Sequence, residues 1–240
     1  MELGGTLRVA PGAILVAEGL TVRGTLEAQR EGQEEGRVVL RGQNSFLQGA
    51  LLGPGTLRNE GLLRIGPSDP LKYVCATVEN VATVRLEGGD IYFGCTNPNI
   101  PGVLRTTGQG VVELVGAHVH PAGVAQLVVE GSEAVLRAGG NNRLNVGFTL
   151  RQTTLRLEGQ GARMQLNADG RFEGENRLEV GEGMTLVLGP TRERVLQLDG
   201  TLVGEVRGQV QLWANLQAPE GKTGTLRLTG QGLQLSLIHI

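Results

Sequence analysis

Near its start the chain reads Gly5-Thr6-Leu7-Arg8-Val9, and the tripeptide Gly-Thr-Leu recurs at Gly24, Gly55, Gly200 and Gly224. Each copy opens a short run in which apolar residues alternate with others, and the run ends at another glycine. Such alternation places the apolar side chains on one face of an extended strand. A unit this short cannot bury that face alone, and it becomes stable only when stacked on copies of itself. The sequence therefore predicts a solenoid.

The spacing of strand-closing glycines indicates the length of one coil. Four such glycines follow one another at nearly equal intervals: Gly139, Gly159, Gly181 and Gly200. Two or three short strands fit into one interval, whereas an antiparallel sandwich is expected to show longer strands joined by Asn-Gly or Asp-Gly turns. Only Asp169-Gly170 and Asp199-Gly200 are of that type. We therefore expect an all-β, single-stranded parallel β-helix (β-solenoid) with about 20 residues per coil and very little helix.

The Gly-Thr-Leu units resemble the repeats of bacterial secreted and surface β-helix proteins, among them autotransporter passenger regions and filamentous-haemagglutinin-like adhesins. The resemblance covers most of the chain. It implies a right-handed coil and an extracellular or bacterial cell-surface location. It implies no site.

Composition excludes several classes of partner. The net charge is −2, and acids and bases alternate along the strands, as in Arg85 and Glu87 or Arg156 and Glu158. A nucleic-acid partner would need a basic block, and a membrane helix would need roughly 20 apolar residues in a row. The chain has neither. Aromatic residues make up only 3%, which disfavours stacking platforms for sugars or bases. We expect no nucleic-acid partner and no membrane insertion.

Cys75 and Cys95 are the only cysteines, and their separation equals the expected length of one coil. They would then lie one above the other in neighbouring coils, about 4.8 Å apart, within reach of a disulfide. Tyr73 and Tyr92 repeat almost the same spacing. Two interpretations stay open: a disulfide, which fits an oxidising setting, and two free thiols that fill the interior as small apolar groups. Two cysteines alone do not complete a zinc site.

His118 and His120 form a His-X-His pair on a predicted strand, so both rings point to one face. A third ligand such as Glu113 or Glu130 would complete a metal chelate, but neither has a diagnostic spacing. We expect two solvent-facing histidines and neither a metal nor a cofactor.

Paired carboxylates would be the mark of a glycoside hydrolase, and an acidic Ca²⁺ site that of a lyase. Asp69 and Asp90 are separated by about one expected coil and form the best pair that stacking would bring together. Both stand in turn sequences, where aspartate caps backbone donors. No Gly-X-Ser-X-Gly nucleophile motif occurs. We expect no catalytic residues.

Two further features have structural interpretations. Asn141-Asn142, with Asn145 nearby, predicts an asparagine ladder that joins successive coils. Trp213 is the only tryptophan, and alternation puts it opposite Leu212, so one of the two faces outward. We expect Trp213 to be packed.

Two segments interrupt the pattern. Gln29 to Gly36 is charged and reads as a solvated loop that leaves the stack, and Asn97 to Gly102 is a turn-rich insertion with two prolines. Neither has the length of a domain linker, so we expect one solenoid domain over residues 1–234. Residues 235–240 resemble a translated sequencing adapter, which predicts a non-native tail and a fragment of a longer protein. The alternative is a real final strand from Leu233 to Ile240.

These features favour a non-enzymatic structural stalk or adhesin-like segment of a bacterial surface or secreted protein, which meets an unknown host-surface or matrix ligand. Two alternatives stay open. One is a polysaccharide-active enzyme, a lyase or glycoside hydrolase, on a pectin-lyase-like β-helix. The other is a phage tail fibre or spike segment.

Overall fold

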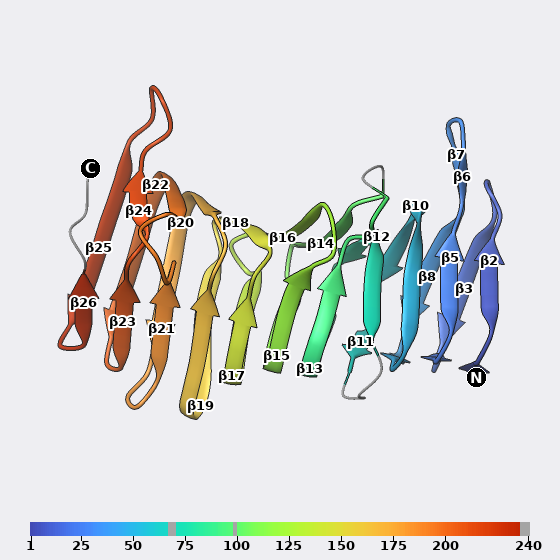
Figure 1. The fold of residues 1–240 in the computed structure, drawn as a ribbon, viewed down its shortest axis with the longest axis horizontal. Coiled ribbons are helices and arrows are strands. Elements are labelled where there is room, and N and C mark those ends of the chain that lie inside the picture. The colour runs from blue at the N-terminus through green and yellow to red at the C-terminus, as the bar shows by residue number, and fades with distance from the viewer. Residues whose placement is uncertain (67–70, 98–99, 236–240) are drawn as a thin grey trace.

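The computed structural model describes residues 1–66, 71–97 and 100–235, and these residues form strands, turns and no helix. Figure 1 shows the strands stacked along one long axis. The strands are β1 Glu2–Leu3, β2 Thr6–Val9, β3 Ile14–Glu18, β4 Thr21–Val22, β5 Thr25–Ala28, β6 Arg30–Glu31, β7 Glu34–Glu35, β8 Arg37–Arg41, β9 Gln43–Phe46, β10 Gly49–Asn59, β11 Leu62–Ile65, β12 Lys72–Asn80, β13 Thr83–Phe93, β14 Gly102–Thr107, β15 Val111–Pro121, β16 Ala125–Glu130, β17 Val135–Leu144, β18 Gly147–Arg151, β19 Thr154–Leu166, β20 Gly170–Val180, β21 Thr185–Leu188, β22 Val195–Val206, β23 Gln209–Leu212, β24 Asn215–Gln217, β25 Gly224–Gly230 and β26 Leu233–Leu235.

All of these strands except β6 and β7 belong to one parallel, hydrogen-bonded sheet that winds around the axis. The winding produces three faces. Face A contains β3, β8, β14, β16, β18 and β24, with the end of β10 and of β12 and the start of β20 and of β22. Face B contains β1, β4, β9, β11 and β25, the first half of β13, β15, β17 and β19, and the second half of β20 and of β22. Face C contains β2, β5, β21, β23 and β26, the start of β10 and of β12, and the second half of β13, β15, β17 and β19.

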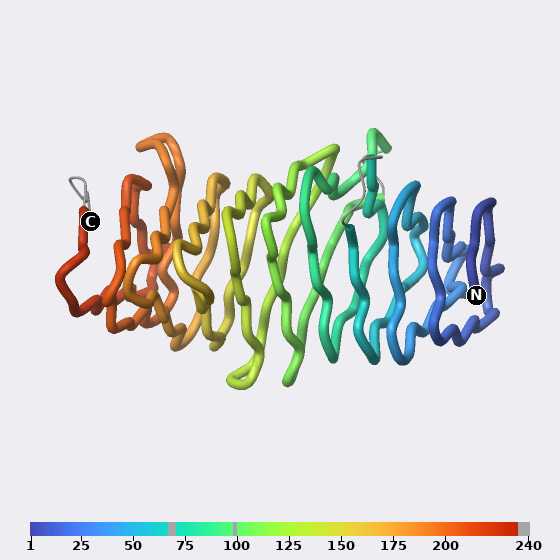
Figure 2. Tube along the Cα trace, turned by 90° about the horizontal axis from the view of Figure 1, so that it is seen from below, coloured from blue at the N-terminus to red at the C-terminus, as the bar shows by residue number. Residues whose placement is uncertain are grey.

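The fold is therefore the predicted parallel β-solenoid, with about 10 coils. The coils follow one another in chain order, with the first and last at opposite ends (Figure 2). In Figure 1 the strands of face C lie in front and run upward, while the chain advances from right to left. The coil is therefore right-handed.

Stacked strands lie ~23 residues apart, close to the predicted coil length of about 20. The coils are unequal. Glu2 pairs with Thr21 across a short coil, whereas Val84 pairs with Val112 across a much longer one. Gly200 pairs with Gly174 and not with Gly181, so the glycines used for the prediction do not all occupy equivalent places in the coil. The coil between Val84 and Val112 is long because it contains the Asn97 to Gly102 insertion.

Many strands are longer than the short strands that the sequence predicts, and β19 has 13 residues. They are long because the hydrogen-bonded ladder continues around the corners, where glycine takes up the positive φ of the bend, as at Gly88 (49°) and Gly89 (75°). Close approach of neighbouring coils also requires glycine. A Cβ atom added at Gly24 would collide with the carbonyl oxygen of Gly5, and one added at Gly49 with that of Gly24.

The Gly-Thr-Leu units occur on all three faces. Each unit therefore marks the start of a strand after a corner, and it does not occupy one fixed position in the coil. Two pairs of them stack directly: Thr6 pairs with Thr25, and Thr201 pairs with Thr225.

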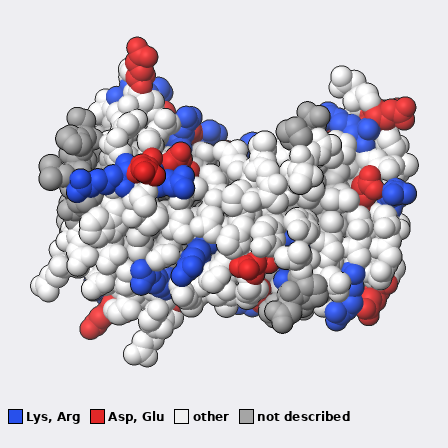
Figure 3. Space-filling model, in the orientation of Figure 1, with Lys and Arg blue, Asp and Glu red and all other residues white. Residues whose placement is uncertain are grey.

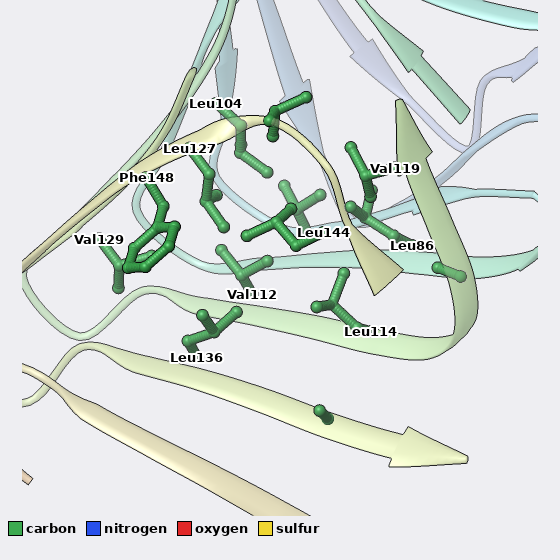
Figure 4. Close-up of a cluster of buried hydrophobic side chains, with 14 of the residues drawn as sticks. Leu86, Leu104, Val112, Leu114, Val119, Leu127, Val129, Leu136, Leu144 and Phe148 are labelled. Carbon is green, nitrogen blue, oxygen red and sulfur yellow. The ribbon is translucent and has the colours of Figure 1, made fainter. Parts of the chain in front are cut away.

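The core is a set of aliphatic rows that run along the axis, one side chain per coil (Figure 4). One row follows face B and consists of Leu63, Val84, Val112, Leu136, Leu155 and Leu178, each at most 2% exposed. Burial of such a side chain contributes roughly 1.5–3 kcal/mol. Phe148 and Phe172, both buried on face A, meet edge to face with ring centroids 5.7 Å apart.

Buried asparagines satisfy the backbone at the corners. Asn59 donates to Asn80 (2.8 Å), which donates to Thr106 (3.1 Å), so three successive coils are joined by one side-chain ladder. Asn142 instead caps a corner: its side-chain oxygen accepts from the Ala117 N–H at 2.9 Å. The predicted Asn141-Asn142 ladder is therefore wrong in detail, since Asn142 bonds to backbone and Asn141 is exposed.

Of the two interruptions of the repeat, the first leaves the stack, and residues 98–99 of the second lie outside the described residues. The Gln29 to Gly36 segment is an antiparallel hairpin of β6 and β7 that projects beyond the coils, and its turn contains Gly32 at φ 58° (Figure 1). The second begins after Phe93 and rejoins face A at Gly102.

Candidate functional site

A disulfide joins Cys75 to Cys95 in neighbouring coils, with a Cα–Cα distance of 5.4 Å. Cys75 is fully buried, although alternation along β12 turns its side chain away from the core. The Cys95 segment covers it at the point where the chain leaves the ladder for the insertion. Of the two interpretations left open by the sequence, the structure contains the disulfide. It acts as a covalent rung at a place where the backbone ladder stops.

Beside the disulfide, three rings form a stack on the outside of face C. The centroids of Tyr73 and Tyr92 are 5.5 Å apart, as their predicted correspondence requires, and His120 continues the stack at 5.4 Å from Tyr92. The interplanar angle is 31° between Tyr73 and Tyr92, which are tilted, and 27° between Tyr92 and His120, which are stacked.

Asp90 lies between the two histidines. Its Oδ1 atom is 3.0 Å from His120 Nε2 and 3.6 Å from His118 Nδ1, and each histidine side chain is 34% exposed. The strand register produces this arrangement, because Asp90 on β13 pairs directly with His118 on β15.

Polar side chains engage both ring nitrogens of His120. Asn167 donates to the side-chain oxygen of Asn145 at 2.8 Å, and the Asn145 amide nitrogen lies 3.3 Å from His120 Nδ1. On the other side of the ring, Nε2 is hydrogen-bonded to Asp90. His120 is therefore a structural link between these side chains. Asn145 thus takes part in a ladder, as predicted, but with Asn167.

The structure keeps the two glutamates proposed as third metal ligands away from the histidines. Glu113 contacts Arg85 (2.8 Å) and Arg137 (3.0 Å), and Glu130 contacts Arg105 and Arg151. Within residues 1–66, 71–97 and 100–235, no group of three or more His, Cys, Asp or Glu side chains is placed to hold a metal ion. Asp69, the suggested partner of Asp90, and residues 236–240 lie outside the described residues.

The most extended polar feature is a continuous ion-pair ladder on face B. Consecutive members, on six strands from β11 to β20, contact one another at 2.5–3.8 Å: Arg64, Glu87, Arg85, Glu113, Arg137, Glu158, Arg156, Glu179 and Arg177. Arginine alternates with glutamate throughout, so each charge lies beside opposite charges, on its own strand or in a neighbouring coil. Hydrogen bonding to Glu179 raises the pKa of Arg156 above its usual value.

A second ladder crosses face A through Arg105, Glu130, Arg151, Glu173 and Arg171. Burial by itself would raise the pKa of Glu173, yet hydrogen bonds from Arg151 and Arg171 hold it below its ordinary value of 4.5. Hydrogen bonds from Arg58 and Arg41 likewise lower the pKa of Glu60.

Other predicted positions have structural roles. Asp169 Oδ1 accepts from the backbone N–H of Val195 at 2.9 Å, as expected of a turn aspartate. The expectation that Trp213 is packed is wrong: Leu212 points inward, and Trp213 is 40% exposed. A surface hollow of about 710 Å³ crosses face A over Gln126, Thr149, Arg171 and Gln197, and Arg171 there is held by Gln197 (2.9 Å) and Glu173.

Comparison with known proteins adds no relative. No protein-family model, curated protein or solved structure matches the chain significantly. The described residues also contain no helix long and apolar enough to cross a bilayer.

Proposed function

We propose that this chain is a non-enzymatic, rod-like segment of a bacterial surface or secreted protein, which holds distance along its axis and presents the segments that leave the stack. The observation that carries the proposal is the face B ladder. Nine charged side chains in successive coils are engaged with one another and hold the coils together.

Charge pairs of this kind suit a spacer. A single exposed ion pair contributes only about 0–1 kcal/mol, but a network in which each member between the two ends has two partners resists separation of one coil from the next. The buried Asn59–Asn80–Thr106 ladder and the disulfide act in the same direction.

Removal of one whole coil tests the spacer role. Deletion of residues 154–176 places Arg177 where Thr154 stands, because the two are register partners, and it also brings Leu178 above Leu136. The spacer proposal predicts a soluble, monodisperse protein with the same β circular dichroism, shorter by one strand spacing of about 4.8 Å. Deletion of half a coil, residues 154–165, is the matched control and should aggregate. Equal failure of both deletions would contradict the proposal.

Location is tested separately. An antibody against the β6–β7 hairpin should label intact cells that express the complete gene, without permeabilisation. Labelling that appears only after lysis would contradict a surface or secreted role.

A further inference from the structure

Face C differs in charge from faces A and B. From β15 to β23 its strand segments contain no aspartate or glutamate: residues 116–121, 141–144, 162–166, 185–188 and 209–212. They do contain Arg143 and Arg163, which are exposed, beside His118 and His120. Figure 3 views this face and shows blue groups over β17 and β19, with a red group over β13, the strand that carries Asp90.

Arg143 and Arg163 are also free of the pairing that engages arginines elsewhere on the coils. On the same two strands, Arg137 and Arg156 each contact two glutamates. Among the described residues, Arg143 and Arg163 have no carboxylate within ion-pair distance. The other described arginines without one, Arg30, Arg192, Arg194 and Arg227, lie in the projecting hairpin, in a loop or in the last described coil. Arg163 contacts the side-chain amide of Gln165. When that amide is oriented so that its oxygen faces the guanidinium group, the oxygen accepts from Arg163 Nη2 at 2.8 Å.

The aromatic groups next to these arginines favour a protein over a sugar. Sugars stack on open ring faces, but the facing sides of Tyr73, Tyr92 and His120 lie against one another, with centroids 5.4–5.5 Å apart. Tyrosine and arginine are enriched where proteins meet proteins. Both tyrosines of the chain and two of its three histidines belong to this one patch.

The spacing of the two guanidinium groups indicates the shape of the ligand. Arg163 pairs with Asn141, so it lies one coil from Arg143 and is displaced by two positions along the strand. With about 4.8 Å between strands and about 3.3 Å per residue, the two Cα atoms are roughly 8 Å apart. Carboxylates at alternate positions of an extended peptide are roughly 7 Å apart. The backbone of face C is already paired within the solenoid, so such a peptide meets side chains only.

We propose that face C between β13 and β19 binds an extended acidic segment of a partner protein, with carboxylates in a Glu-X-Glu spacing on Arg143 and Arg163. An arginine binds a carboxylate through two parallel hydrogen bonds, which gives orientation as well as attraction. The inference depends on face C alone and does not require the spacer role.

The test uses the full chain and a short fluorescent peptide of alternating Glu and Ser, followed by anisotropy. The wild-type protein should bind this peptide, and the double variant Arg143→Gln, Arg163→Gln should bind it at least about tenfold more weakly. Affinity should fall as salt rises. The matched control is Arg177→Gln, which also removes one positive charge but lies on face B, and it should leave binding of the peptide unchanged.

Three results would overturn the proposal. These are no binding of the peptide by the wild-type protein, equal binding by the double variant, and binding of heparin without binding of the peptide. The last would assign the patch to an anionic glycan. Both exchanged residues are exposed, so the melting temperature of the double variant should match that of the wild type, which separates loss of binding from loss of fold.

Discussion

Removal of the covalent rung gives the most quantitative prediction. The double variant Cys75→Ala, Cys95→Ala opens a loop whose ends are separated by 20 positions in the sequence. In the chain-entropy model, a loop of this length stabilises the native state by about 3 kcal/mol at 25 °C. One kcal/mol shifts the melting temperature of a chain this large by about 2–4 °C, so we expect a decrease of about 6–12 °C.

The assay is thermal unfolding followed by circular dichroism, with and without reductant. The reduced wild type should melt close to the double variant, and reductant should not affect the variant. Hydrogen exchange should locate the loss of protection in β12 and β13, because a solenoid loses stability locally. A decrease smaller than about 1 °C, which is well below the shift expected from loop entropy, would refute the role assigned to this bond. Two titratable thiols in protein prepared under oxidising conditions would refute it as well.

Three further changes test other elements. Asn80→Ala removes the middle of the buried ladder and should cost about 1–3 kcal/mol, measured by urea denaturation, because polar groups in the coils on both sides lose their partner; a loss below about 0.5 kcal/mol would contradict the ladder. Gly49→Ala should prevent soluble expression, because φ at Gly49 is 97° and the new Cβ would collide with the Gly24 carbonyl oxygen. The control is Gly221→Ala, which also lies at positive φ but has open space around it and is expected to fold. The pKa of Glu173 is lower in the folded state than its ordinary value of 4.5, so the ion pairs of this carboxylate stabilise the fold above pH 4.5 and this stabilisation is lost as pH falls through the folded pKa. Glu173→Gln should therefore flatten the dependence of melting temperature on pH between about 6 and 3. An unchanged slope would contradict the role assigned to Glu173.

The sequence predicted the elements that depend on local pattern. Alternation and glycine spacing were sufficient for parallel stacked strands. The stacking of Tyr73 on Tyr92 followed because the coil between them is close to the predicted length. The hairpin at Gln29 to Gly36 was foreseen as a departure from the stack because its composition cannot fill a core.

The contacts around Asp90 and the ion-pair ladder could not be predicted, because they depend on the exact length of each coil, which sets the register between neighbouring strands. Asp90 meets His118 across a coil much longer than the predicted one, whereas a uniform coil pointed to Asp69 instead. The Arg85–Glu113 contact spans the same long coil. The Arg-X-Glu pattern along the strands was visible, but its role as a ladder depends on register. The orientation of Trp213 was missed because alternation does not state which of two neighbours faces inward.

The central claim is that each coil lies in parallel register on the next, and cysteine cross-linking between Gly-Thr-Leu units tests it most directly. Thr6→Cys with Thr25→Cys, and separately Thr201→Cys with Thr225→Cys, place thiols on register partners one strand spacing apart. The account predicts that mild oxidation links each pair, seen by mass spectrometry of unreduced peptides, while Thr6→Cys with Thr225→Cys stays unlinked within one molecule. Unlinked register pairs, or a link between the two ends, would contradict it.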